Sequence, residues 1–260
     1  MRVALTIAGS DSGAGAGIQA DLKTFAAHGV YGVTAITAVT AQNTLGVTTF
    51  QALPADLITA QIEAVVADIG ADAAKTGMLP NVASVEAVAA AVVDLEIPLL
   101  VVDPVMVATS GDRLLDDEAI AAMKAELFSR ALTVTPNIPE AEALTGMSIA
   151  TDEDRRQAAR AIAALGAASV IIKGGHLATD DISDLLFDGH AFHEFRGERV
   201  HGSTHGTGCT FSAALAAHLA LGRPLVEAIP LAQRYVAGAI RHAPGLGRGQ
   251  GPMQHFWEDR

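Results

Sequence analysis

Short apolar runs alternate with longer amphipathic segments along almost the whole chain. The apolar runs have the length of buried strands and predict strands at residues 3–8, 32–39, 73–76, 99–103, 132–135, 169–173 and 184–187. Helices are predicted between and after them, at residues 15–27, 55–69, 83–94, 117–128, 152–165, 208–221 and 225–241. Valine at positions 82, 85, 88 and 92 illustrates the helical spacing.

This regular alternation predicts an α/β fold with a doubly wound, mainly parallel sheet and helices on both faces. The dipeptide Asp188-Gly189 stands between two apolar stretches and predicts a hairpin, so a small antiparallel edge is expected. No linker-like stretch or internal repeat divides the sequence, which predicts a single domain over residues 1–260. Ligands of such sheets bind at the carboxyl ends of the strands, and the chemically interesting residues here follow strands.

Composition narrows the class of protein. Half of the 260 residues are hydrophobic but only 4% are aromatic, which favours a core of Ala, Val, Leu and Ile between helices and a parallel sheet. The net charge of −12 speaks against nucleic acid or an anionic membrane surface as a partner. We expect no membrane segment, and a single cysteine fits a reducing, cytoplasmic compartment. A phosphorylated ligand must then be held by local features and a divalent cation.

The stretch at residues 204–215 places two glycines and the chain's only cysteine at the start of an apolar helix. The first turn of a helix has unpaired N–H groups and a partial positive charge, so it attracts anions. Gly206 and Gly208, on either side of Thr207, let a phosphate approach the backbone without interference from a Cβ. The same environment is expected to lower the pKa of the Cys209 thiol. The stretch therefore predicts a phosphate site beside a group that handles a proton.

A glycine-rich loop, GSDSGAGAG at residues 9–17, joins the first predicted strand to the first helix. A dinucleotide-binding loop would read G-x-G-x-x-G, with an acidic residue at the end of the second strand. Here the third glycine comes one position early, and the second strand ends in Ala38-Val39-Thr40. The Walker pattern is absent from the chain. The loop is either a structural turn or a place of close ligand approach, but it is no nicotinamide or P-loop fingerprint.

Three further strand ends carry polar side chains. Asp103 follows one buried strand, and Asn137 and Glu140 follow the next and open a helix; such hard oxygen ligands suit Mg²⁺. The same spacing suits a capping box with Asn137 as N-cap, so both interpretations stay open. Lys173 ends an apolar strand, where it is suited to pair with phosphate oxygens or, alternatively, to extend its ammonium into solvent.

With these residues placed, the chain resembles the hydroxymethylpyrimidine/phosphomethylpyrimidine kinase family of thiamine biosynthesis, in the ribokinase-like superfamily. The resemblance follows the chain in order from end to end, so its combined specificity is far higher than that of any one motif. The matching segments are residues 8–24, 41–44, 75–79, 103–106, 135–140, 173–176, 205–209 and 245–256.

The resemblance implies a ribokinase-like fold, usually a homodimer, and an ATP- and Mg²⁺-dependent enzyme with two successive reactions. The first phosphorylates the hydroxymethyl group of 4-amino-5-hydroxymethyl-2-methylpyrimidine, and the second converts that monophosphate to the diphosphate. In the implied pocket, the Gln42 amide offers one donor and one acceptor to a ring nitrogen and an exocyclic amine, and Met78 and Val105 offer apolar faces to the ring. By position, this pyrimidine pocket comprises Ala16, Asp21, Gln42, Met78 and Val105.

For phosphoryl transfer, the resemblance assigns the Gly206–Cys209 amides, including that of Thr207, to the transferring phosphate and Lys173 to its oxygens. Asp103 and Glu140 organise Mg²⁺, and Asn137 helps to hold the ATP phosphates. Cys209 stands where the sugar kinases of the superfamily use aspartate as general base. We hypothesise that a thiol suits an enzyme with two unlike acceptors, because a carboxylate would repel the second, anionic one.

Four other functions compete with this interpretation. A vitamin B6 kinase is the nearest, because relatives of this family accept B6 vitamers and a thiol can add to an aldehyde; Gln42 and Met78 favour the pyrimidine. A non-catalytic sensor on the same fold is disfavoured by the presence of Lys173, Asp103 and Glu140 together with the cysteine. A nicotinamide oxidoreductase lacks its acidic residue. A thiol hydrolase with His205 and Cys209 lacks an evident third group.

Overall fold

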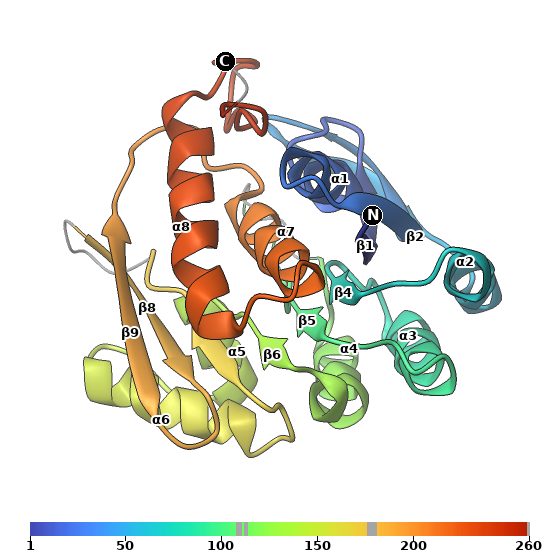
Figure 1. The fold of residues 1–260 in the computed structure, drawn as a ribbon, viewed down its shortest axis with the longest axis horizontal. Coiled ribbons are helices and arrows are strands. Elements are labelled where there is room, and N and C mark those ends of the chain that lie inside the picture. Colours follow the sequence, from blue (N-terminus) through green and yellow to red (C-terminus); the bar gives the residue numbers. More distant parts are fainter. Residues whose placement is uncertain (108–110, 112–113, 176–180, 259–260) are drawn as a thin grey trace.

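One mixed sheet runs through the computed structural model, which describes residues 1–107, 111, 114–175 and 181–258. Within these residues the strand order is β3-β2-β1-β4-β5-β6-β7-β8-β9, and the order reverses direction at β1 (Figure 1). The strands from β2 to β7 in this order pair in parallel, whereas β3, β8 and β9 are antiparallel. The strands are β1 (Val3–Asp11), β2 (Tyr31–Asn43), β3 (Gly46–Ala52), β4 (Ala73–Thr76), β5 (Leu100–Val102), β6 (Thr133–Val134), β7 (Val170–Ile172), β8 (Asp181–Phe187) and β9 (Phe192–Glu198).

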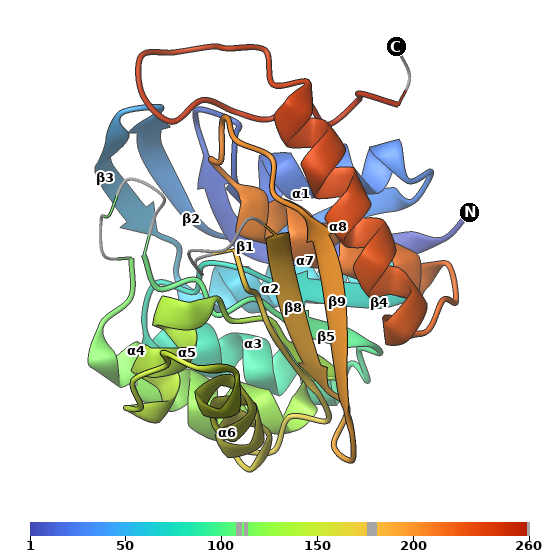
Figure 2. The ribbon, with the colours of Figure 1, turned by 90° about the vertical axis from the view of Figure 1, so that its left-hand side faces the viewer.

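Helices cover both faces of this sheet, as the alternation of strand and helix predicts. Helices α1, α7 and α8 pack on one face, with α7 between the other two, and α2 to α6 pack on the opposite face (Figures 1 and 2). The helices are α1 (Gly17–Ala27), α2 (Ala55–Asp68), α3 (Val82–Asp94), α4 (Asp117–Ala122), α5 (Ile138–Thr145), α6 (Asp152–Ala163), α7 (Thr207–Ala220) and α8 (Leu225–Arg241).

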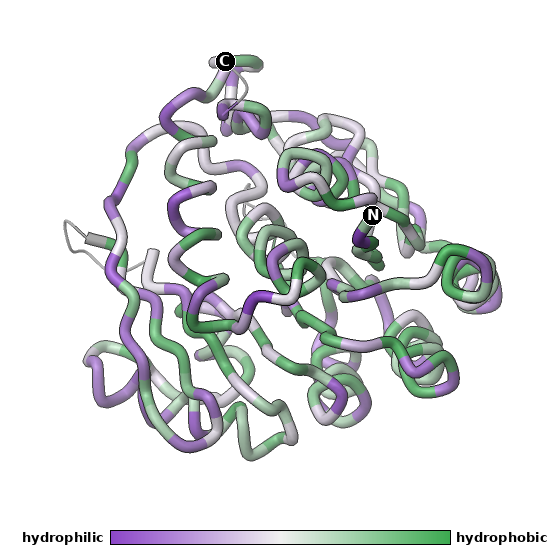
Figure 3. Tube along the Cα trace, viewed as in Figure 1, coloured by the Kyte–Doolittle hydropathy of each residue, from purple (hydrophilic) through white to green (hydrophobic). Residues whose placement is uncertain are grey.

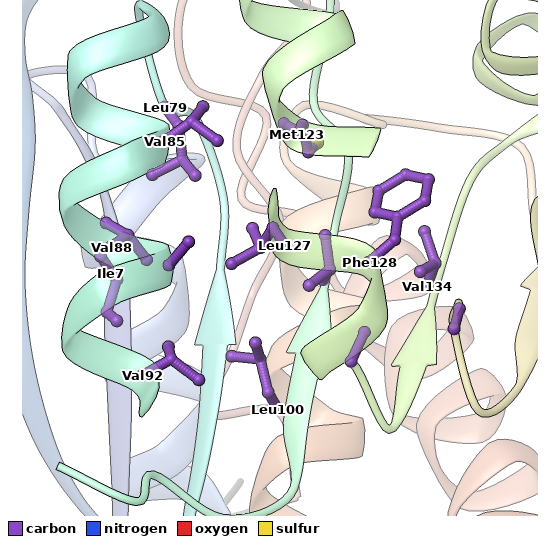
Figure 4. Close-up of a cluster of buried hydrophobic side chains, with 14 of the residues drawn as sticks. Ile7, Leu79, Val85, Val88, Val92, Leu100, Met123, Leu127, Phe128 and Val134 are labelled. Atoms are coloured by element: carbon purple, nitrogen blue, oxygen red, sulfur yellow. The ribbon is translucent and has the colours of Figure 1, made fainter. Parts of the chain in front are cut away.

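The strand side chains alternate between two hydrophobic cores. Leu100 and Val102 of β5 belong to the core under α2 to α6, whereas Val101 belongs to the core under α7 and α8. Figure 4 shows part of the first core, where Val88 of α3 and Leu100 lie among the buried side chains. Helix α7 is buried over most of its length and is neutral to apolar in Figure 3, whereas the outer helices alternate in hydropathy.

Two elements differ from the sequence prediction. The antiparallel edge predicted at Asp188-Gly189 is confirmed as the β8–β9 hairpin. A second antiparallel edge, which was not predicted, is formed by β3 on β2. Strand β3 is mostly exposed, so it carries no apolar run to reveal it. The predicted helix 117–128 is α4 followed by a π-helical turn, in which the Phe128 N–H donates to the Met123 carbonyl. Residues five apart share a side in such a turn, and both side chains are buried.

Irregular pairing occurs in the strands that border the site. The β1–β2 register shifts between Ala8 and Ser10, and the β2–β3 register shifts between Ala41 and Gln42. Such bulges change the direction of the side chains that follow them. No helix in the described part of the chain combines the length and hydropathy needed to span a membrane.

Candidate active site

A cavity of about 1070 Å³ opens at the carboxyl ends of the parallel strands. It lies beside β1, where the strand order reverses, which is the usual ligand position in doubly wound sheets. Its walls come from the glycine-rich loop after β1, the ends of β2, β4, β5 and β7, and helices α5, α7 and α8. All but one of the predicted site residues line it, namely Ala16, Gln42, Met78, Asp103, Val105, Asn137, Glu140, Lys173, Gly206, Thr207, Gly208 and Cys209.

The N-terminus of α7 opens into this cavity. Gly206 is the N-cap in a left-handed conformation (φ 81°), and no side chain caps the helix. A Cβ built on Gly208 would lie 3.3 Å from the Lys173 Nζ and 3.9 Å from the Asp103 Oδ2. The Thr207 N–H donates to the Thr204 carbonyl at 3.2 Å. The first turn of α7 stands next to the lysine at Gly208, as an anion site requires.

Lys173 joins two carboxyl groups at the edge of the sheet. Its Nζ lies 3.1 Å from the Asp103 Oδ1 and 3.9 Å from the Glu140 Oε2. Burial disfavours the ammonium, but the two carboxylates outweigh this and raise the pKa of Lys173. The lysine side chain is only 13% exposed, so it does not extend into solvent, contrary to the alternative interpretation.

Asn137 and Glu140 form the capping box that the spacing suggested. The Asn137 side chain accepts from the Glu140 N–H at 2.9 Å, and the Glu140 Oε2 accepts from the Asn137 N–H at 2.7 Å. The capping role does not exclude the ligand role, because both residues also line the cavity. Burial raises the pKa of Glu140 to about 7, although Lys173 opposes this rise.

Asp21 is the exception among the predicted contacts. We expected its carboxylate in the pyrimidine pocket, but it is fully buried behind the cavity wall. It pairs with the Lys75 ammonium at 2.9 Å and accepts from the Thr6 hydroxyl at 2.6 Å. Both oxygens of Asp21 have partners in the protein interior, and the residue does not line the cavity. The structure therefore places Asp21 in a buried ion pair and not in the predicted substrate contact.

Cys209 also requires a correction. The start of a helix was expected to lower the pKa of its thiol, and the backbone of Gly17 does act in that direction. Burial outweighs this donor and the nearby Lys75 ammonium, and raises the pKa of Cys209 to about 11. The thiol is therefore protonated and uncharged at neutral pH in this structure.

The fold brings three polar groups into the site to which the kinase interpretation of the sequence assigned no role. The Ser212 hydroxyl, one turn into α7, donates to the Asp103 Oδ2 at 3.1 Å. The His205 Nε2 lies 2.9 Å from the Asp11 Oδ2, so this histidine pairs with a carboxylate of the glycine-rich loop. The motif at residues 9–17 contained Asp11, but only the fold reveals its partner. His176, at the end of the motif 173–176, lies outside the described residues.

Comparison with known proteins supports the family suggested by the motifs. The model of the family described as phosphomethylpyrimidine kinase matches residues 11–254. A hydroxymethylpyrimidine/phosphomethylpyrimidine kinase of Bacillus subtilis is 49% identical over 97% of this chain and 94% of its own length. A thiamine biosynthesis bifunctional protein of Geobacter sulfurreducens is 52% identical over 97% of this chain, which spans 52% of that relative.

A solved structure agrees in fold. An ADP complex of Bacillus subtilis pyridoxal kinase superposes with a TM-score of 0.92 at 40% identity, covering 100% of this chain and 99% of that one. This likeness confirms the ribokinase-like architecture expected from the resemblance. With the matched family model and relatives near 50% identity, the chain belongs to the phosphomethylpyrimidine kinase family.

Proposed function

We propose that this protein transfers the γ-phosphoryl group of ATP to 4-amino-5-hydroxymethyl-2-methylpyrimidine and then to the resulting monophosphate, in thiamine biosynthesis. The observation that carries the proposal is the meeting of the α7 N-terminus with Lys173 and Asp103 at one end of the cavity. Phosphoryl transfer depends chiefly on positioning and on stabilising charge, and these groups supply both. The acceptor is supported by the names of relatives at 49% identity, which are hydroxymethylpyrimidine/phosphomethylpyrimidine kinases.

On the donor side, the amides of Gly206–Cys209 bind the transferring phosphoryl group and Lys173 balances its charge. The backbone donors are fixed by the helix, so they need no rearrangement when charge develops during transfer. Thr207 and Asn137, which both line the cavity, contact the ATP phosphates.

The acid pair fits a magnesium ion. Asp103 and Glu140 offer carboxylate oxygens from neighbouring strand ends, and Mg²⁺ usually takes one or two carboxylates with the remainder water and phosphate. Asp103 is held by Lys173, Thr135 and Ser212, so its orientation is fixed before any ligand arrives. When bound, Mg²⁺ supplies positive charge to the phosphates of ATP.

On the acceptor side, the Gln42 amide orients the pyrimidine edge, and Ala16, Met78 and Val105 surround the ring. The Cys209 thiol stands at the junction of the acceptor and phosphoryl sites, where it handles the proton of the hydroxymethyl group. An uncharged thiol adds no negative charge when the acceptor is itself a phosphate.

A second candidate acceptor is pyridoxal, because the superposed structure is that of a pyridoxal kinase. An assay of ATP consumption, with mono- and diphosphate products measured by mass spectrometry, separates the two functions. We expect both phosphorylations of the pyrimidine, at a kcat/KM at least tenfold above that for pyridoxal. A preference for pyridoxal would replace the pyrimidine proposal, and no turnover with either acceptor would favour a non-catalytic sensor.

Three further features stay predictions. We expect residues 1–260 to act as one kinase domain, the protein to form a homodimer, and its compartment to be the cytoplasm. Light scattering coupled to size-exclusion chromatography measures the oligomeric state directly.

A further inference from the structure

The carboxylate of Asp11, in the cavity wall, has four hydrogen-bond partners within the described residues. It accepts from the backbone N–H groups of Gly13, Gly15 and Ala16 at 2.7–3.0 Å, and from the His205 imidazole at 2.9 Å. A carboxylate with these partners is an acceptor, so the His205 Nε2 carries the proton. Burial alone would raise the pKa of Asp11, but His205 and the backbone donors lower it, and the group is an anion at neutral pH.

His205 attaches this loop to the start of α7. A Cβ on Gly15 would overlap the His205 ring, and a Cβ on Gly206 would overlap the Gly15 carbonyl oxygen. The glycine-rich loop and the phosphoryl-binding turn are thus in direct contact. The Asp11–His205 pair joins these two walls at a distance of 2.9 Å.

The Asp11–His205 pair also lies next to Gln42, the residue proposed to bind the edge of the pyrimidine. The Gln42 Nε2 lies 3.4 Å from the His205 Nε2. The Ser12 hydroxyl of the glycine-rich loop donates to the Gln42 carbonyl at 2.7 Å and accepts from its N–H at 2.8 Å. Gln42 is therefore positioned relative to α7 through the loop that Asp11 organises.

Charge distinguishes the two acceptors on this side of the cavity. We define the acceptor half as the described lining residues 8–11, 16, 17, 40, 42, 77, 78, 105 and 204–209. Among these residues, His205 is the one basic side chain and Asp11 is the one acidic side chain. A hydroxymethyl acceptor is neutral, whereas the monophosphate brings an anion to this wall. Without the imidazole, the Asp11 carboxylate would face that anion directly.

We propose that His205, held by Asp11, is a specificity-determining positioning residue that admits the phosphorylated acceptor. His205 covers the Asp11 carboxylate. It also maintains the spacing between the cavity wall that carries Gln42 and the phosphoryl site at the start of α7. This inference rests on the proposed function, because it concerns the second of its two phosphorylations.

The test compares the two phosphorylations in His205→Gln, Asp11→Asn and the double variant. In His205→Gln, kcat/KM for the monophosphate acceptor is expected to fall at least tenfold more than kcat/KM for the hydroxymethyl acceptor, with the KM for ATP changed less than twofold. The double variant also lacks the Asp11 carboxylate that His205→Gln uncovers. We therefore expect it to recover most of the lost kcat/KM for the monophosphate acceptor relative to the hydroxymethyl acceptor. A group that merely supports the fold would lower both steps together.

The matched control is His193→Gln on the β8–β9 hairpin. His193 forms the same kind of pair, 2.7 Å from the Asp188 Oδ2, but both side chains are over a third exposed and neither lines the cavity. Both steps should be unchanged in this variant. Equal losses of the two steps in His205→Gln, or no recovery in the double variant, would overturn the proposal. Failure of the unaltered protein to phosphorylate either pyrimidine would instead overturn the proposed function.

Discussion

Gly206 packs directly on the carbonyl of Gly15, so that no side chain fits between the N-cap of α7 and the glycine-rich loop. The two residues are 191 positions apart and belong to the loops that follow β1 and β9. Their contact brings the acceptor wall and the phosphoryl-binding turn together. The site is therefore sensitive to the size of residues that carry no chemistry themselves.

Gly206→Ala is expected to abolish most activity in both phosphorylations. A methyl group would collide with Gly15 and would also occupy a left-handed conformation, which costs about 1–2 kcal/mol. Gly222→Ala is the matched control, because Gly222 follows the other end of α7 with φ 83° but has nothing within 4 Å of its Cβ position. Steady-state kinetics should show a small effect in Gly222→Ala at most. Similar losses in both variants would mean that backbone strain, and not the contact, matters.

Cys209→Asp should impair the second phosphorylation more than the first. The thiol is uncharged, whereas aspartate would place a carboxylate in front of an anionic acceptor. A unit charge about 4 Å from a phosphate costs roughly 1–4 kcal/mol, which corresponds to a loss of about fivefold or more. The ratio of kcat/KM for the two acceptors measures this effect directly. Equal losses in both steps would contradict the role assigned to the thiol.

Much of the fold and most site residues could be predicted from the sequence, because buried parallel strands leave apolar runs and the chemistry follows their ends. Lys173 and Asp103 were found in this way. The partners of Asp11 and Asp21 were not, since a hydrogen bond between residues 194 or 54 positions apart leaves no local pattern. The pKa of Cys209 was predicted in the wrong direction, because the helix terminus is a local signal whereas burial depends on everything packed around the thiol.

Removing one member of the Asp21–Lys75 pair should destabilise the protein strongly. Burial disfavours the Lys75 ammonium, but Asp21 and other nearby acids more than compensate and raise the pKa of Lys75. Lys75→Met leaves the Asp21 carboxylate buried without its cation, at a cost of about 3–5 kcal/mol. The double variant with Asp21→Asn should lose less than the single one. Urea unfolding of the Lys75→Met, Asp21→Asn and double variants measures the difference, and a double loss equal to the sum of the two single losses would show that the pair is not coupled.

Acid should destabilise the protein through histidines that are neutral when folded. Burial, with the positive charge of His28 and Arg223, lowers the pKa of His218 to about 3, and burial with the charge of Lys23 lowers that of His255 to about 4. Unfolded histidines titrate near 6.5, so below that pH the unfolded chain binds more protons than the folded one. Their contribution to stability is fully present above about pH 6.5 and is lost as the pH falls toward 4.

Both rings have a hydrogen-bond partner in the folded protein, and at His218 this partner disfavours protonation. Arg223 donates to the His218 Nδ1 at 3.2 Å, so that nitrogen must accept, and the His255 Nε2 lies 3.1 Å from the Thr210 hydroxyl in the first turns of α7. The urea midpoint is expected to fall between pH 7.5 and pH 5.0. A His218→Gln, His255→Gln variant cannot take up these protons and should show a smaller fall, whatever its stability at pH 7.5. An unchanged pH dependence in that variant would assign the acid sensitivity to other groups.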